Sequence, residues 1–193
     1  MKISAKIKIE GTKPLLFHTF PIDTLDAGKA KKGTTGNDAE EWKNTVLMDN
    51  ERRLYVYGSY LRACISEGGK HIKVGKGNIS KKVGACLEVN GERVFLDDLK
   101  VPADKDLTRL NTDKVYLDVR SVVNPMTKGR NLRYRIAAKE GWSLSAIITW
   151  DDYVVSKENM KQCVENGGLY DGIGDARKIG FGKFILLSFQ ILD

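Results

Sequence analysis

Two stretches of this sequence gather side chains that suit a polyanionic ligand. The first is the segment 119–139, which holds six cations and no acidic residue. Its cations are Arg120, Lys128, Arg130, Arg133, Arg135 and Lys139. Because phosphates need positive charge and unstacked bases need an aromatic surface, these cations around Tyr134 favour contact with a single-stranded nucleic acid. A solvated hairpin with one charged face is the alternative, since exposed strands often carry arginines.

The second stretch is "YDGIGDARKIGFGKF", residues 170–184, which leads into an apolar segment. Its glycines and cations are Gly172, Gly174, Arg177, Lys178, Gly180, Gly182 and Lys183. Glycine permits positive φ and lets backbone N–H groups approach an anion, so the stretch predicts a loop that cradles phosphates. It is neither a Walker A loop nor a dinucleotide-binding turn, because Arg177 stands where the third glycine of G-x-G-x-x-G belongs. A flexible connection without a ligand is the alternative.

The composition is that of a soluble globular protein with a basic surface. Its 193 residues include 32 Lys+Arg against 25 Asp+Glu, a formal charge of +7, which favours polyanionic partners. Cys64, Cys86 and Cys163 lie far apart with no C-x-x-C, so we expect reduced thiols, no metal site and no cofactor. No apolar run approaches the roughly 18 residues that span a bilayer. The start, "MKISAKIKIEG", is unlike a secretory signal, so we expect a cytoplasmic protein with no membrane partner.

Hydrophobic periodicity predicts strands along much of the chain. Residues 2–9 alternate strictly, which places Lys6 and Lys8 on the open, basic face of a half-buried strand. Further strands are expected at 54–57, 114–123, 130–137 and 142–150. A last strand, 183–192, is almost wholly apolar, and we therefore expect it at the centre of a sheet or covered on both faces.

Helix boundaries are marked by capping residues. Ser59 is the expected N-cap of a helix over 60–67 that two glycines stop, and Ser156 is the expected N-cap of a second helix. Asp38 is the expected cap of a shorter helix that reaches Val46.

Three segments interrupt this pattern. Residues 23–38 predict a loop, residues 70–82 are too polar to pack, and the Asn90-Gly91 pair predicts a hairpin. Without them the order of elements is β-α-β-β-α-β. We therefore expect one α+β domain, with a ferredoxin-like (RRM-like) antiparallel sheet and helices on one face. The expected insertions lie at about 23–46, 70–113 and 120–135.

Two motifs together resemble the RAMP superfamily, the CRISPR-associated RNA-binding proteins. That family typically shows a G-x-G-x-x-R-x-x-G-F-G segment before its last strand, and residues 172–182 match it. It often also shows a P-G-S-S-L-R/K-G turn between a strand and a helix. Gly58, Ser59, Leu61 and Arg62 match that turn, with Tyr57 where proline is usual. The layout is also similar to that of uncharacterised proteins of phages and mobile elements.

The resemblance implies an RRM-like core that binds single-stranded RNA or DNA along its sheet and its glycine-rich loop. Family members that form the backbone of effector complexes multimerise side by side along a guide strand, and a protruding hairpin reaches between neighbours. The segment 120–135 is the candidate for that hairpin. Arg62 joins the candidate nucleic-acid contacts because it belongs to the matched turn.

The resemblance also leaves catalysis open, since some RAMP proteins cleave RNA through a histidine or an aspartate. His18 is the candidate histidine, and Asp26 and Asp38 are the candidate aspartates. A histidine flanked by apolar residues is more often a packed residue than a catalyst.

Three hypotheses follow from these motifs. The first is a non-catalytic, multimerising subunit that binds single strands, RNA in preference to DNA. The second is an endoribonuclease that uses His18. The third is a phage adaptor or structural protein that does not bind nucleic acid.

Overall fold

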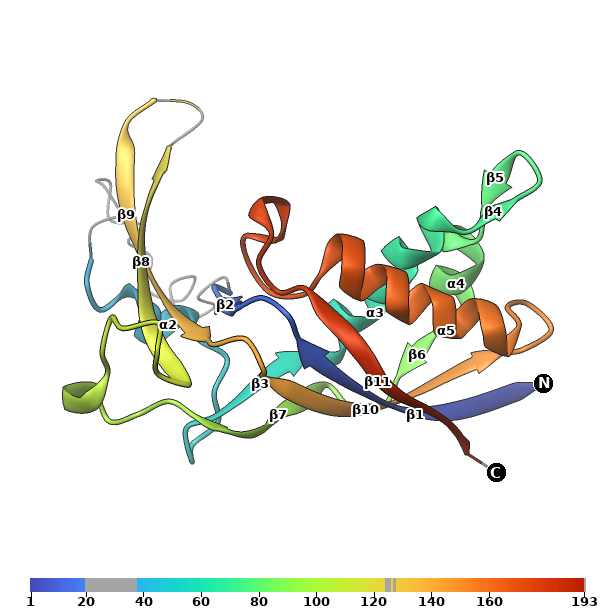
Figure 1. The fold of residues 1–193 in the computed structure, drawn as a ribbon, viewed down its shortest axis with the longest axis horizontal. Coiled ribbons are helices and arrows are strands. Elements are labelled where there is room, and N and C mark those ends of the chain that lie inside the picture. The colour runs from blue at the N-terminus through green and yellow to red at the C-terminus, as the bar shows by residue number, and fades with distance from the viewer. Residues whose placement is uncertain (20–37, 124–125, 127, 193) are drawn as a thin grey trace, which may run out of the picture.

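The computed structural model describes residues 1–19, 38–123, 126 and 128–192. It is an α+β fold in which helices cover one face of a twisted antiparallel sheet (Figure 1). The strands of this sheet follow the order β11-β1-β10-β7-β3, and the short β6 also pairs with β10. Their bounds are β1 Lys2–Gly11, β3 Arg53–Tyr57, β6 Glu88–Val89, β7 Arg93–Lys100, β10 Ser143–Asp151 and β11 Phe184–Leu192.

The first strand has the alternation that the sequence predicted. Ala5, Ile7 and Ile9 are fully buried under the helices, whereas Lys6 and Lys8 are exposed on the open face of the sheet. β1 lies between two strands from the end of the chain, since Lys2 is opposite Asp151 of β10 and Gly11 is opposite Phe184 of β11. The N-terminal strand is thus an interior strand of the sheet, next to its β11 edge.

The helices pack over the buried face of β1 and β10. They are α3 Gly58–Gly68, α4 Ser80–Cys86 and α5 Lys157–Asn166. The predicted cap of α5 is confirmed, because the Ser156 hydroxyl accepts a hydrogen bond from the Asn159 N–H at 3.3 Å. The predicted cap of α3 is wrong. That helix begins at Gly58, directly after β3, and its N-cap is Tyr57, whose side chain makes no capping hydrogen bond.

A second, three-stranded sheet carries the predicted hairpin. It consists of β2 Leu15–Phe17, β9 Arg130–Ala138 and β8 Val115–Val123, with β9 in the middle. Together with β10, these strands confirm the predictions at 114–123, 130–137 and 142–150. Figure 1 shows that β8 and β9 rise well away from the main sheet. The hairpin thus projects from the body of the molecule.

The short elements are α2 Glu41–Thr45, η1 Gly69–His71, β4 Lys73–Val74, β5 Gly77–Asn78, η2 Asp104–Asp106, η3 Gly167–Asp171 and η4 Arg177–Ile179. Asp38 lies before α2, where its carboxylate accepts a hydrogen bond from the Glu40 N–H at 2.9 Å. The carboxylate therefore stabilises the turn that leads into α2, and Glu40 is the N-cap of the helix.

Three further predictions are wrong. β11 is an edge strand paired with β1, and most of its residues are exposed, because its apolar side chains are not matched by a second covering layer. Asn90-Gly91 does not close a hairpin, since β6 and β7 on either side both pair with β10. The segment 70–82 is only partly loop, because Ile79 is buried in the core and Ser80 begins α4.

The cysteines are free thiols, and burial raises the pKa of Cys64 and of Cys163 to about 12. Two of the three thiols are thus held as neutral core groups. Within the part of the chain that the structure describes, no helix has both the length and the apolar character that a membrane span requires.

Candidate functional site

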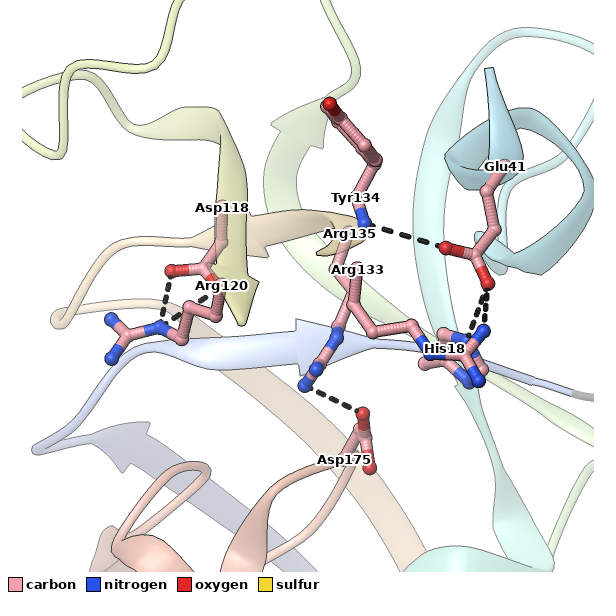
Figure 2. Close-up of polar contacts among 8 residues, drawn as sticks. All are labelled: His18, Glu41, Asp118, Arg120, Arg133, Tyr134, Arg135 and Asp175. Carbon is pink, nitrogen blue, oxygen red and sulfur yellow. Dashed lines mark hydrogen bonds and ion pairs between the residues drawn. The ribbon is translucent and has the colours of Figure 1, made fainter. Parts of the chain in front are cut away.

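The base of the β8–β9 hairpin meets α2 and the segment 170–184, hereafter the glycine-rich loop. Figure 2 shows that three arginines of the hairpin each face a carboxylate. Arg120 Nε donates to both oxygens of Asp118 at 2.8 and 2.9 Å. Arg133 and Arg135 pair with carboxylates from elsewhere in the chain, and these two pairs fix the hairpin to the rest of the molecule.

Glu41 of α2 is the centre of the first of these contacts. Its Oε1 accepts a hydrogen bond from Arg133 Nη1 and lies 3.4 Å from Nε2 of His18. Its Oε2 accepts from the backbone N–H of Tyr134 at 3.4 Å. The Glu41 side chain is only 12% exposed. One carboxylate thus joins α2, the end of β2 and β9.

The second contact joins the hairpin to the glycine-rich loop. Arg135 is 5% exposed, and its Nη1 donates to Oδ2 of Asp175 at 2.9 Å. The Asp175 N–H in turn donates to the carbonyl of Leu16 in β2 at 2.9 Å. Close by, the Arg120 guanidinium lies 4.6 Å from the centre of the Phe181 ring. Charge, backbone and aromatic contacts therefore hold the loop against the hairpin.

The backbone of the glycine-rich loop is bonded within the protein. The Gly182 N–H donates to the Pro14 carbonyl at 2.8 Å, and the Ile173 N–H donates to the Gly182 carbonyl at 3.0 Å. Gly182 has φ of +68°, and a Cβ there would overlap the Ile173 carbonyl. The predicted cradle of backbone N–H groups is therefore not open at these positions, and glycine serves the close approach of two chain segments.

The tip of the loop has a different character. Arg177 and Lys178 lie in η4 with exposed side chains, and neither takes part in an ion pair within the described residues. Their charges face solvent. The tip, held by an internally bonded loop, is thus a fixed platform for two cations.

A cavity of about 180 Å³ lies between the tip, β2 and α3. Its polar lining includes His18, Tyr60, Asp175 and Arg177, and Leu16, Phe17, Val56 and Ile173 are among its apolar residues. An imidazole and a guanidinium thus line the same largely apolar cavity, hereafter the recess. Such a recess suits one unstacked base or ribose, with the cation on the adjoining phosphate.

Other predicted contacts lie elsewhere. Arg62 donates to the carbonyls of Leu87, at 2.9 Å, and Gly84, so its guanidinium closes the end of α4. Lys183 donates to the carbonyl of Tyr170. Lys128 and Arg130 are exposed near the end of the hairpin. Asp38 is exposed and bonds within its own turn, and Asp26 lies outside the described residues.

Lys6 and Lys8 lie on the opposite side of the molecule from the helices, on the open face of the main sheet. Lys8 borders a cavity of about 800 Å³ that also includes Lys100, Lys139, Asp98 and Glu140. Because both signs of charge line it, this hollow is a weaker anion site than the loop tip. No cluster of three or more His, Cys, Asp or Glu side chains suited to a metal ion occurs within residues 1–19, 38–123, 126 and 128–192.

Comparison with known proteins gives a likeness of fold alone. No protein-family model matches the sequence. No curated protein matches it significantly. Among solved structures, the fold is similar to a chain of the Type III-B Cmr-beta, determined by cryo-electron microscopy bound to cognate target RNA, with a TM-score of 0.56 and 9% sequence identity. The likeness covers 100% of this chain and 61% of the other, so this chain spans less than two thirds of its neighbour's length.

Proposed function

We propose that this protein binds single-stranded nucleic acid, RNA in preference to DNA, as a non-catalytic subunit of a nucleoprotein complex. The observation that carries the proposal is the platform of Arg177 and Lys178. It is held by backbone hydrogen bonds and by the Arg135–Asp175 pair, beside a recess of about 180 Å³. Likeness of fold to a chain from a complex bound to its target RNA supports RNA as the ligand.

The topology supports a ferredoxin-like core and kinship with the RAMP superfamily. The six elements of such a core are β1, α3, β6–β7, β10, α5 and β11. Counted along the chain, the four strands of this core are β1, β6–β7, β10 and β11. They lie in the sheet in the order fourth, first, third, second strand. That is the order in which the ferredoxin-like motif arranges its four strands. In this assignment β2, α2, β8 and β9 are additions. They supply Glu41 and the hairpin arginines, whereas Arg177 and Lys178 come from the loop between α5 and β11.

The two groups of cations have separate roles in this proposal. Arg120, Arg133 and Arg135 are neutralised by their carboxylates and position the hairpin and the loop. The exposed cations, Arg177 and Lys178 on the loop and Lys128 and Arg130 on the hairpin, contact phosphates. Binding of this kind releases counterions, so it weakens as salt rises.

The hairpin is the part of the chain proposed to contact a neighbouring copy. Val123, Met126 and Leu132 near its end are exposed apolar residues beside Arg130. A projecting hairpin with apolar and basic side chains suits a contact with both a neighbouring subunit and the shared nucleic-acid strand. Light scattering at increasing protein concentration, with and without RNA, measures that association, and a strictly monomeric protein in both conditions contradicts it.

Fluorescence polarisation with labelled single-stranded RNA, single-stranded DNA and duplex DNA tests the binding function. The variant Arg177→Ala, Lys178→Ala should weaken single-strand binding and make the plot of log affinity against log salt shallower by about 1.4, because two phosphate contacts are lost. The matched control is Lys157→Ala, Lys161→Ala, which removes two exposed cations from α5. Absence of wild-type binding, or binding that salt does not change, contradicts the proposal and favours the adaptor hypothesis.

The contact between His18 and Glu41 favours a second candidate function, endoribonuclease activity. The two side chains lie 3.4 Å apart, and His18 lines the recess, where an imidazole could accept the proton of an attacking hydroxyl. Incubation of wild type and His18→Ala with single-stranded RNA tests it. Cleavage by the wild type that the variant lacks, with binding preserved, supports the activity, and absence of wild-type cleavage contradicts it.

A further inference from the structure

A second basic surface lies at the far end of α3 from the recess. The segment 68–87 contains five lysines and no acidic residue. Of these lysines, only Lys70 is ion-paired within the described part of the chain, with Glu67. Lys73, Lys76, Lys81 and Lys82 are all exposed. This surface therefore has four available positive charges, twice as many as the tip of the glycine-rich loop.

The β4–β5 hairpin contributes little to the protein core. Its strands are two residues each, joined through Gly75, which has φ of +58°. Residues 73–78 are all exposed, and Val74 is 47% exposed. The neighbouring Ile79 and Val83 are buried and anchor α4, so the hairpin is held at its base and its basic tip faces solvent. Figure 1 shows this hairpin projecting beyond α4 on the side away from the main sheet.

An aromatic pair lies between this hairpin and the glycine-rich loop. The rings of His71 and Tyr170 are 4.4 Å apart and tilted by 38°, and Tyr170 is 53% exposed. Asp171 Oδ2 lies 3.8 Å from His71 Nε2 and has no hydrogen-bond partner among the described residues, so this carboxylate faces the imidazole. An exposed ring in a basic surface suits a nucleobase that stacks while its phosphates meet positive charge.

We propose that Lys73, Lys76, Lys81 and Lys82, with the Tyr170–His71 pair, form a second contact surface for a single-stranded nucleic acid. This inference rests on the proposed function, because the second surface would contact the same nucleic-acid strand that Arg177 and Lys178 bind. Tyr170 begins the glycine-rich loop, and Figure 1 shows that loop and the β4–β5 hairpin on the same side of the molecule. In this proposal the nucleic-acid strand passes the tip of the glycine-rich loop, stacks one base on Tyr170 and continues to the four lysines.

Fluorescence polarisation with single-stranded RNA of about 20 nucleotides, longer than the roughly 4–16 that one domain commonly covers, tests the surface. The double variant Lys73→Ala, Lys76→Ala should lower affinity for the RNA at least about ten-fold at low salt. It should also reduce the slope of log affinity against log salt by about 1.4. Tyr170→Ala should lower affinity for the RNA roughly five-fold or more. It should leave the slope of log affinity against log salt unchanged, because it removes a stacking surface and no charge. Tyr170→Phe keeps the ring and should retain wild-type affinity.

The control is again Lys157→Ala, Lys161→Ala, which should bind as the wild type does. If the Lys73/Lys76 variant binds RNA as well as this control, the inference is overturned and the surface faces another partner, such as an acidic protein. If both double variants lose affinity equally, the effect is one of net charge and the inference is again overturned. If the wild type itself does not bind, the proposed function fails as well, so the two failures are distinguishable.

Discussion

The β8–β9 hairpin and the glycine-rich loop are both rich in cations, but the fold uses their cations in opposite ways. At the base of the hairpin, Arg133 and Arg135 are paired with Glu41 and Asp175. At the tip of the loop, Arg177 and Lys178 have no ion-pair partner in the described residues and face solvent. The difference teaches that the number of cations in a segment does not measure the charge that it offers to a ligand, because distant carboxylates decide which cations are available.

The strongest test of this comparison concerns the glycine that shapes the loop. Gly182→Ala should destabilise the protein by about 2–5 kcal/mol, the sum of roughly 1–2 for left-handed backbone and about 1–3 for overpacking against Ile173. Gly180→Ala is the control, since Gly180 also has positive φ but no atom within 4 Å of an added Cβ. Urea denaturation measures both, and equal losses would mean that close approach does not constrain the loop.

The next test breaks the link between the two regions. Asp175→Ala leaves the buried Arg135 guanidinium without its carboxylate, and we expect a loss of about 2–3 kcal/mol, below the full value for a buried pair because Asp175 is 38% exposed. Asp175→Asn keeps an acceptor and should lose less. A midpoint of urea denaturation equal to that of the wild type would show that the loop and the hairpin are not fastened by this pair.

A smaller effect is expected where the carboxylate has several partners. Glu41→Gln removes the charge that faces Arg133 and His18 but keeps the side-chain shape, and a loss of about 1–2 kcal/mol should follow. Combining it with Arg133→Gln in a double-mutant cycle should give a coupling of at least about 0.5 kcal/mol. Strict additivity would mean that Arg133 is as available to a ligand as Arg177 is.

The smallest expected change in stability is at the loop tip. Arg177→Ala, Lys178→Ala should alter the free energy of unfolding by no more than about 0.5 kcal/mol, because neither side chain is buried. The same double variant is the one expected to weaken RNA binding. Should it unfold at clearly lower urea concentration, the tip is a structural element and the contrast between the two regions disappears.

Local patterns in the sequence predict much of this fold. The alternation in residues 2–9, the strands of the β8–β9 hairpin and the Ser156 cap all depend on neighbouring residues, and all are confirmed. The Ser59 cap of α3 is a local prediction that failed, but the other failures depend on long-range packing. Burial of β11 could not be judged from its apolar composition, because exposure depends on whether another layer covers the sheet.

The candidate site was predictable only in part, for the same reason. The sequence indicates the glycine-rich loop and the basic hairpin, but nothing in its spacing indicates that Glu41 reaches Arg133 across 92 positions. The helix predicted near Trp42 could have directed attention to its charged residues, yet the side chain that points at β9 follows from tertiary packing alone. The acid-free span 119–139 therefore looks more basic in the sequence than it is in the folded chain.

The place of β1 has a consequence for how the chain is made. Every residue of this strand from Lys2 to Glu10 pairs with a residue of β10 between Ser143 and Asp151, and its other neighbour is β11. At translation rates of about 5–20 residues per second, these partners leave the ribosome on the order of ten seconds after β1 does. During that interval this interior strand lacks both of its partner strands, so its unpaired edges are open to pairing with other nascent copies.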